Sequence, residues 1–313
     1  MTGRDEWLAW RRGGIGASDI AGILGISPWA SPYSVWANKV GLVADEESTE
    51  QMEMGLDMEP AVERMFHRKT GLWVACQQEL VQHPDLPWAR ASLDGRVFES
   101  AGLASDDRDA SLGNYEGKTT SDSVAKWEEG VPVQYETQVQ WQMFVTGAEH
   151  TWVGCLHASF GAKFRVYEIH RNDDDIAFIY ERVARFWTDH IVTGTPPETD
   201  AHTATTDTLG RLPADAGEIV DLSDLSAEFA RLEALRATRA NTEERIDAIE
   251  NAIKARMGSA TEAMVGGRVA ATWRQSDRTT IDTKALKAAL PDVANEFSKT
   301  SSSRRFLLKT EKE

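Results

Sequence analysis

The sequence predicts an α/β protein with a central mixed sheet flanked by helices, followed by a C-terminal extension of helices and a hairpin. An amphipathic helix pattern precedes a run of strand-like stretches, and strands and helices then alternate up to about residue 193. A polar stretch finally separates this part from a long helical repeat. We therefore expect a main domain over residues 1–195, a linker over residues 196–218 and an extension over residues 219–313.

The N-terminal part predicts helices. Gly, Ser, Pro and Trp are frequent over residues 13–42, which favours short helices there. Ser18 could cap a helix over Ile20–Leu24, and Ser31 with the following proline could begin the next. Apolar residues then recur at steps of three and four over residues 49–70, as in a helix with one buried face. The glycine that follows is the expected stop of this helix.

Strand-like segments come next in the chain. Three of them are expected to form a meander: residues 72–81, 89–99 and 115–120. Two helices are expected next, at residues 121–130 and 131–147. A strand pair follows at residues 151–160 and 163–170, and a strongly periodic helix at residues 174–191.

The C-terminal third has a different composition. Small and polar residues dominate at about 194–218, as in a linker. Apolar residues at helical spacing over residues 222–257 predict a long helix or helical hairpin that packs on the body or on a second copy. The tail contains a hairpin-like unit (266–282), a short helix (283–290) and a basic end (301–309).

Composition limits the class of protein. The chain of 313 residues is 41% hydrophobic, enough for a substantial core, and carries a net charge of −16, which is unusual for a nucleic-acid binder unless basic groups line one groove. Two cysteines cannot form a four-cysteine zinc or iron–sulfur site. No apolar run could span a membrane, and the N-terminus lacks a signal-peptide core, so we expect a cytoplasmic protein with no membrane partner.

Residues 113–120 read GNYEGKTT, whose last letters resemble a phosphate-binding loop. Such a loop needs G-x-x-x-x-G-K-[ST] after a buried strand. Leu112 stands where the first glycine would be, and the residues before it are polar. The pattern therefore disfavours a nucleotide-binding loop, although an ATP-dependent enzyme remains an alternative.

The other interpretation is a catalytic pair of carboxylates with a lysine. Glu116 and Lys118 are two apart, so on a strand they point to the same face, and a neighbouring strand can bring Asp94 beside them. Converging carboxylates repel unless a divalent cation lies between them, and oxygen ligands suit Mg²⁺ or Mn²⁺. A metal-bound water next to a lysine is suited to hydrolysis of a phosphodiester. The same spacing is equally typical of a surface cross-strand pair.

Further motifs accompany this spacing in a fixed order. They are W-x-x-x-R ending at Arg11, I-G-A-S ending at Ser18, GLDMEP (55–60), SLDG (92–95), EGKT (116–119) and QVQWQM (138–143). The ordered set resembles the lambda-exonuclease, or YqaJ-type viral recombinase, family of the PD-(D/E)xK nuclease superfamily. The resemblance covers about residues 4–193 and implies a restriction-endonuclease-like core.

The resemblance also implies roles for individual residues. The implied metal ligands are Glu59, Asp94, Glu116 and the Gly117 carbonyl. The implied catalytic set is Asp94, Glu116, Lys118 and Gln138, where Gln138 positions the nucleophile or the lysine. Arg11, Ser18 and Ser92 match a pocket for a 5′-phosphate, which a guanidinium with hydroxyl donors recognises well.

The implied activity is 5′→3′ degradation of one strand of linear double-stranded DNA, leaving 3′ overhangs for phage-type recombination. The implied cofactor is Mg²⁺, replaceable by Mn²⁺, with two ions in the site. The implied partners are a single-strand annealing protein and further copies of the chain in a trimeric ring, inside a bacterial host. The alternatives are another endonuclease or DNA-repair nuclease of the superfamily, and a non-catalytic DNA-binding or scaffold protein.

Overall fold

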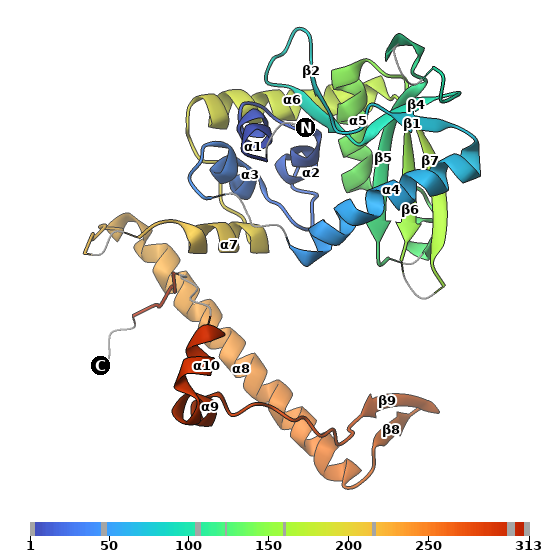
Figure 1. Cartoon of the computed structure of the whole chain (residues 1–313). Helices are drawn as coiled ribbons and strands as arrows, with labels where there is room; N and C mark the ends of the chain where they lie inside the picture. Colours follow the sequence, from blue (N-terminus) through green and yellow to red (C-terminus); the bar gives the residue numbers. More distant parts are fainter. Residues whose placement is uncertain are drawn as a thin grey trace. The chain divides into compact units, whose positions relative to one another are not determined.

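A computed structural model describes residues 4–44, 49–103, 108–122, 124–158, 161–214, 217–298 and 304–309 (Figure 1). The chain divides into two compact units. The larger comprises Met1–Pro213 with Ser303–Glu313, and the smaller comprises Ala214–Ser302. Among the described residues, no helix has the length and apolar character needed to cross a bilayer.

The larger unit is built on a five-stranded sheet with the strand order β1-β4-β5-β6-β7. Its strands are β1 (Trp73–Ala75), β4 (Gly95–Phe98), β5 (Gly113–Thr120), β6 (His150–His157) and β7 (Lys163–His170). β5 and β6 pair in parallel, whereas the other neighbours are antiparallel. Because a parallel pair needs a crossover, the helix α5 (Val133–Thr146) connects β5 to β6. The predicted α/β class with a central mixed sheet is confirmed.

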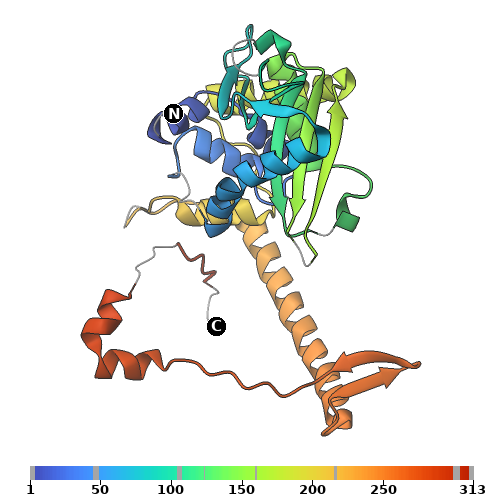
Figure 2. The same ribbon diagram turned by 45° about the vertical axis from the view of Figure 1, so that its right-hand side comes forward.

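Helices cover both faces of this sheet. Tyr115 packs against Phe66 of α4 (Glu50–Thr70), with ring centroids 5.0 Å apart, and Figure 2 shows α4 lying across that face. The next residue, Glu116, points to the opposite face, where it meets Gln142 of α5. Successive strand residues alternate between faces, so β5 is held between α4 and α5.

A second, two-stranded sheet stands beside the first. It consists of β2 (Glu79–Gln82) and β3 (Arg90–Leu93). Two of the expected strands, residues 72–81 and 89–99, are therefore each divided into two strands that belong to different sheets. The first is broken between β1 and β2, where Cys76 and Gln78 have positive φ angles of 56° and 57°. The second is broken at Asp94, where the chain passes from one sheet to the other. The antiparallel order of the predicted meander is confirmed, but the breaks inside its first two strands were not predicted.

Gly95 makes this passage possible. A Cβ atom at Gly95 would lie 2.5 Å from Val74 Cγ1 and 3.1 Å from the Ala75 carbonyl oxygen. Any side chain here would therefore push β4 away from β1. The glycine after Asp94 thus allows close strand packing next to this aspartate.

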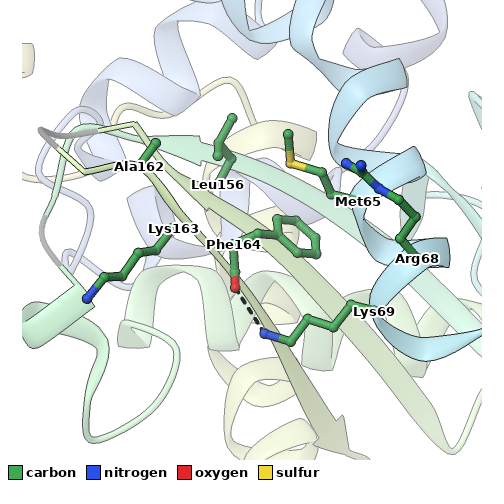
Figure 3. A pocket seen from close by; sticks show the side chains of 7 residues that line it. All are labelled: Met65, Arg68, Lys69, Leu156, Ala162, Lys163 and Phe164. Atoms are coloured by element: carbon green, nitrogen blue, oxygen red, sulfur yellow. Dashed lines mark hydrogen bonds between the residues drawn. The ribbon is translucent and has the colours of Figure 1, made fainter.

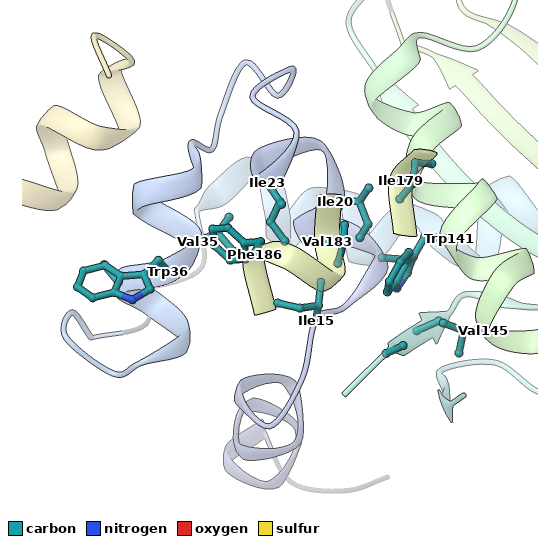
Figure 4. Packing of buried hydrophobic residues seen from close by; sticks show 14 of the residues in the cluster. Ile15, Ile20, Ile23, Val35, Trp36, Trp141, Val145, Ile179, Val183 and Phe186 are labelled. Carbon is teal, nitrogen blue, oxygen red and sulfur yellow. The ribbon is translucent and has the colours of Figure 1, made fainter. Parts of the chain in front are cut away.

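The main hydrophobic core lies between the N-terminal helices, β3, α5 and α6 (Figure 4). The N-terminal elements are α1 (Arg4–Arg12), η1 (Ala17–Asp19), α2 (Ile20–Ile23) and α3 (Pro32–Lys39). The helix α6 (Asp173–Phe186) continues as the π-helical turn η4 (Trp187–Val192). Ile15, Trp141 and Val183 are buried at the centre of this core.

Most local predictions for the helices are confirmed. Ser31 caps α3 by accepting a hydrogen bond from Ser34, and Gly71 ends α4 with a φ of 79°. The predicted cap at Ser18 is wrong. Ser18 lies inside η1, where its hydroxyl accepts a hydrogen bond from Arg11, and the N-cap position of α2 is Asp19, which forms no side-chain cap.

Two segments differ from expectation. The helix expected over residues 121–130 is only the 3-10 turn η3 (Val124–Trp127), while the 3-10 turn η2 (Arg108–Ala110) precedes β5. The segment expected to be a linker contains α7 (Thr203–Arg211). Thr205 of α7 is buried and lies 2.7 Å from the Ser31 hydroxyl, so α7 packs through hydroxyl groups that an apolar pattern does not reveal.

The smaller unit contains α8 (Ser226–Met257) after the turn η5 (Ser223–Leu225), the hairpin β8 (Glu262–Val265) and β9 (Arg268–Thr272), and the short helices α9 (Thr283–Ala289) and α10 (Pro291–Glu296). The long periodic segment is thus one helix. The hairpin begins earlier than predicted. Gly266 and Gly267, expected at its start, form its tight turn with φ angles of 60° and 78°.

Candidate active site

Asp94, Glu116 and Lys118 are brought together around β5. Lys118 Nζ lies 2.6 Å from Glu116 Oε1, as expected for residues two apart on a strand. Asp94 Oδ2 accepts a hydrogen bond of 2.8 Å from the Gly117 amide, between those two residues. The GKT sequence lies wholly inside β5, so it is not a phosphate-binding loop, and the ATP-dependent alternative loses its basis.

Glu116 is almost completely buried, with 3% of its surface exposed, and α5 supplies its other partners. Gln138 Nε2 donates to Glu116 Oε1 at 2.7 Å, and Gln142 Nε2 donates to Oε2 at 2.7 Å. Gln138 Oε1 also lies 3.3 Å from Lys118 Nζ. Two glutamines therefore fix the orientation of a buried carboxylate, which would otherwise be costly to desolvate.

Gln142 is a site residue that the sequence analysis missed. The signal was present, because Gln138 and Gln142 are four residues apart and lie on the same face of a helix. Lys118 is further enclosed by Tyr135, whose ring centroid is 4.9 Å from the ammonium nitrogen. Tyr135 also comes from α5, one turn before Gln138.

The site carries more negative than positive charge. Burial, followed by the nearby charge of Glu116, raises the pKa of Asp94 to about 8. Burial alone would lower the pKa of Lys118, but Glu116 and Asp94 raise it above its usual value. Lys118 therefore remains an ammonium at neutral pH, and one ammonium does not compensate the carboxylates around it.

Glu59 approaches from α4. Burial and the charge of Glu116 raise its pKa, which brings Glu59 into the same electrostatic cluster as Glu116. Its Oε2 accepts a hydrogen bond of 3.1 Å from Gln78, one of the two residues with positive φ between β1 and β2. Gln78 is a second partner that the sequence analysis missed.

The chemistry of these groups suits a hard divalent cation, although in the structure the carboxylate oxygens of Glu59, Asp94 and Glu116 do not all lie within 4.8 Å of one another. Glu59, Asp94 and Glu116 offer only oxygen ligands, which Mg²⁺ and Mn²⁺ prefer. Burial, and after it the charge of Glu116, raises the pKa of Asp94 despite the nearby Lys118, so a bound cation would favour the ionised form of this carboxyl. The number of ions and the ligand role of the Gly117 carbonyl stay predictions.

A second polar cluster lies near the N-terminus. Arg11 Nη2 donates to Ser18 Oγ at 3.0 Å and lies 3.4 Å from Asp19 Oδ1. Lys39 Nζ lies 2.6 Å from Asp19 Oδ2. Burial alone would raise the pKa of Asp19, but Lys39 and Arg11 lower it, so Asp19 stays charged and holds both cations in place. The structure thus brings Arg11 and Ser18 together.

Ser92 lies on β3, and among the described residues its hydroxyl forms no hydrogen bond to Arg11 or Ser18. The backbone does connect the two regions. The backbone amide of Arg90, two residues earlier on β3, donates a 2.9 Å hydrogen bond to the Ile15 carbonyl. The strand that carries Ser92 therefore links the Arg11 cluster to Asp94.

A hollow of about 370 Å³ lies on the α4 side of the sheet (Figure 3). Arg68, Lys69 and Lys163 contribute positive charge to its lining, and the Lys69 ammonium donates to the Phe164 carbonyl at 3.0 Å. The predicted catalytic residues are not part of its lining. It is a cationic recess in a chain whose net charge is −16.

Comparison with known proteins gives consistent matches. The family model of the YqaJ-like viral recombinase domain matches residues 6–149. The protein YqaJ of Bacillus subtilis (strain 168) is 30% identical over 312 residues, covering 98% of this chain and 94% of the relative. The solved structure of an alkaline exonuclease from Laribacter hongkongensis, in complex with dAMP, is 22% identical and has a TM-score of 0.48. The match covers 60% of this chain and 93% of the exonuclease chain. A phage-related exonuclease from Haemophilus somnus 129PT is 11% identical with a TM-score of 0.43, covering 58% and 96% of the two chains.

Proposed function

The chain belongs to the YqaJ-like viral recombinase domain family, and from this membership we propose that it is a metal-dependent nuclease that degrades one strand of linear double-stranded DNA from the 5′ end. The observation that carries the proposal is the convergence of Asp94, Glu116 and Lys118 on β5, with Lys118 Nζ 2.6 Å from Glu116 Oε1. The products would carry 3′ overhangs suited to phage-type homologous recombination.

Asp94 and Glu116 would hold Mg²⁺, which Mn²⁺ could replace, and Glu59 would join them from α4. A bound divalent ion would supply an acidic water molecule and a Lewis acid for the phosphodiester. With a cation present, the charge that now raises the pKa of Asp94 would be offset, and Asp94 would bind as a carboxylate at neutral pH.

Lys118 would orient the attacking water and stabilise the charge that develops on the phosphate oxygens. Its ammonium is already fixed by Glu116 and by Gln138, at 2.6 and 3.3 Å. Such prior fixation means that little reorganisation is needed during the reaction. Gln142 is a positioning residue, because it acts on the reaction only by holding Glu116.

Arg11 and Ser18 would receive the 5′-phosphate of the strand being degraded, with Ser92 as a further proposed contact. Arg11 is held by Asp19 but keeps 32% of its side chain exposed, so part of its guanidinium is available to a ligand. A guanidinium beside a hydroxyl is a good receptor for a phosphate dianion. A requirement for this group would direct the enzyme to strand ends.

The broader assignments rest on the same family membership. We propose that residues 1–195 act as the nuclease domain, residues 196–218 as a connection and residues 219–313 as an extension for contacts with other proteins. The proposed assembly is a trimeric ring around DNA that works with a single-strand annealing protein in the bacterial cytoplasm. The exposed Phe229, Ile249 and Ile253 of α8 support an interaction role for the extension.

The direct test uses linear duplex DNA labelled at the 5′ or the 3′ end, with a 5′-phosphate or a 5′-hydroxyl, in Mg²⁺ or in chelator. We expect Mg²⁺-dependent release of nucleotides from the 5′ end, fastest with the 5′-phosphate. Cleavage of closed circular duplex would instead indicate an endonuclease. If no substrate were degraded, and the Glu116→Gln variant behaved like the natural protein in this assay, the result would support a non-catalytic DNA-binding role.

A further inference from the structure

Two histidines and a glutamate meet where β6 begins and β7 ends. Ring nitrogens of His150 and His170 and a carboxylate oxygen of Glu168 all lie within 4.8 Å of one another. We propose that these three residues form a second metal site, for a late first-row transition metal such as Zn²⁺. This site is separate from the all-oxygen cluster at Asp94, and its occupancy does not depend on nuclease activity.

The strand register produces this grouping. His150 is directly opposite His170 in the antiparallel pair, and Glu168 is two residues before His170, so all three side chains share one face. Trp152, opposite Glu168, stacks on the His150 ring with centroids 5.7 Å apart at 28°. Backbone pairing and this stacking therefore fix His150 before any ligand binds.

The donor atoms are arranged as metal ligands are. His150 Nδ1 is shielded from solvent and has no hydrogen-bond partner among the described residues, yet it lies 3.4 Å from Glu168 Oε1. Ligands of a tetrahedral zinc ion, with bonds of about 2.0–2.1 Å, are separated by about 3.3 Å. A cation between these two atoms would be bound by the unpartnered nitrogen without moving either residue far.

His170 completes the set. Its ring centroid is 4.7 Å from that of His150, at an angle of 71°, so the two rings meet edge to face instead of stacking. His170 and Glu168 are exposed, and their side chains can therefore adjust to an ion while His150 stays fixed. A fourth ligand would be water, which leaves an open position.

The chemistry of the donors determines which metal would bind. Two imidazoles and one carboxylate suit Zn²⁺, Ni²⁺ or Cu²⁺, whereas Mg²⁺ prefers oxygen ligands alone. β7 is the last strand of the sheet, so an ion held by both β6 and β7 would fasten an edge strand to its neighbour. Binding to the folded state alone would also raise the stability of the unit.

The test uses the full chain carrying Asp94→Asn, which weakens metal binding at the proposed active site. After removal of metals with a chelator, Zn²⁺ is titrated by calorimetry and Co²⁺ by its visible absorption. We expect one equivalent bound, with the absorption of a tetrahedral nitrogen–oxygen site. His170→Ala and Glu168→Gln should each weaken binding by roughly tenfold or more.

The matched control is Glu149→Gln, which removes the same charge from an exposed residue next to His150 and should leave binding unchanged. Circular dichroism establishes that each variant is folded, and both substituted ligands are exposed. Absence of stoichiometric binding would overturn the proposal, as would binding that His170→Ala leaves unaltered. A failure of the nuclease assay would have no bearing on either result.

Discussion

Lys118 Nζ and Glu116 Oε1 lie 2.6 Å apart on one face of β5, and both are enclosed by α5. One strand thus supplies both the carboxylate and the ammonium, and one helix supplies the side-chain amides that orient them. Asp94 reaches the same point because the chain changes sheets there. The arrangement needs no loop movement to bring the three groups together.

Replacement of Lys118 by methionine should reduce the rate of DNA hydrolysis by roughly 10²-fold or more, because the side chain keeps its bulk and loses its charge. The rate is measured under saturating DNA and Mg²⁺. Lys126→Met is the matched control, since Lys126 is exposed and forms a surface salt bridge with Asp122, away from Glu116. Equal losses in the two variants would contradict the role of Lys118.

Gln142→Leu should destabilise the protein by about 1–3 kcal/mol, because Glu116 Oε2 loses its hydrogen-bond donor in a buried position. Urea denaturation measures the change in the free energy of unfolding. Gln51→Leu, at an exposed position of α4, should change it by less than about 0.5 kcal/mol. A similar small change in Gln142→Leu would show that the glutamine does not support the carboxylate.

The stability of the metal-free protein should depend on Asp94. Its folded pKa of about 8 lies above its ordinary value, so the folded state binds the proton more tightly than the unfolded state. This contribution is fully present below about pH 4 and is lost as the pH rises towards 8. In chelator, the free energy of unfolding should therefore fall over this range.

Asp94→Asn should remove that pH dependence and stabilise the metal-free protein at pH 8 by at least about 1 kcal/mol. Chemical denaturation at pH 5 and pH 8 measures both effects. Added Mg²⁺ should restore stability at pH 8 in the natural protein and not in the variant. Parallel curves for the two proteins would mean that Asp94 is not protonated as described.

Arg11→Ala should abolish the preference for a 5′-phosphate over a 5′-hydroxyl while leaving slow degradation of both substrates. The Asp19 carboxylate retains Lys39 as a partner, so the fold should survive. Arg12→Ala makes the same charge change one residue away and should keep the preference. If Arg11→Ala retained the full preference, the phosphate pocket would lie elsewhere.

The sequence was sufficient where a feature depends on local spacing. The periodicity of residues 49–70 predicts α4, and the two-residue step from Glu116 to Lys118 predicts their shared face. The glycine after α4 and the Ser31 cap follow from backbone chemistry within a few residues. Such features need no knowledge of the rest of the chain.

Features that depend on distant segments were not predictable in this way. The chain breaks between β1 and β2 through positive φ at Cys76 and Gln78, which are residue types that rarely adopt it. Ser18 gives up its expected cap for Arg11, and Thr205 of α7 is buried through a hydroxyl contact with Ser31. The contact between Thr205 and Ser31 joins segments 174 residues apart, and no local pattern reveals it.

The most direct measurement of the central claim is the affinity of Mg²⁺ or Mn²⁺ for the protein, followed together with the degradation of 5′-phosphorylated linear duplex. Glu116→Gln should weaken metal binding and abolish degradation, whereas the folded structure should be retained. Full degradation by Glu116→Gln in the presence of metal would contradict the assignment of Asp94, Glu116 and Lys118 as one catalytic centre.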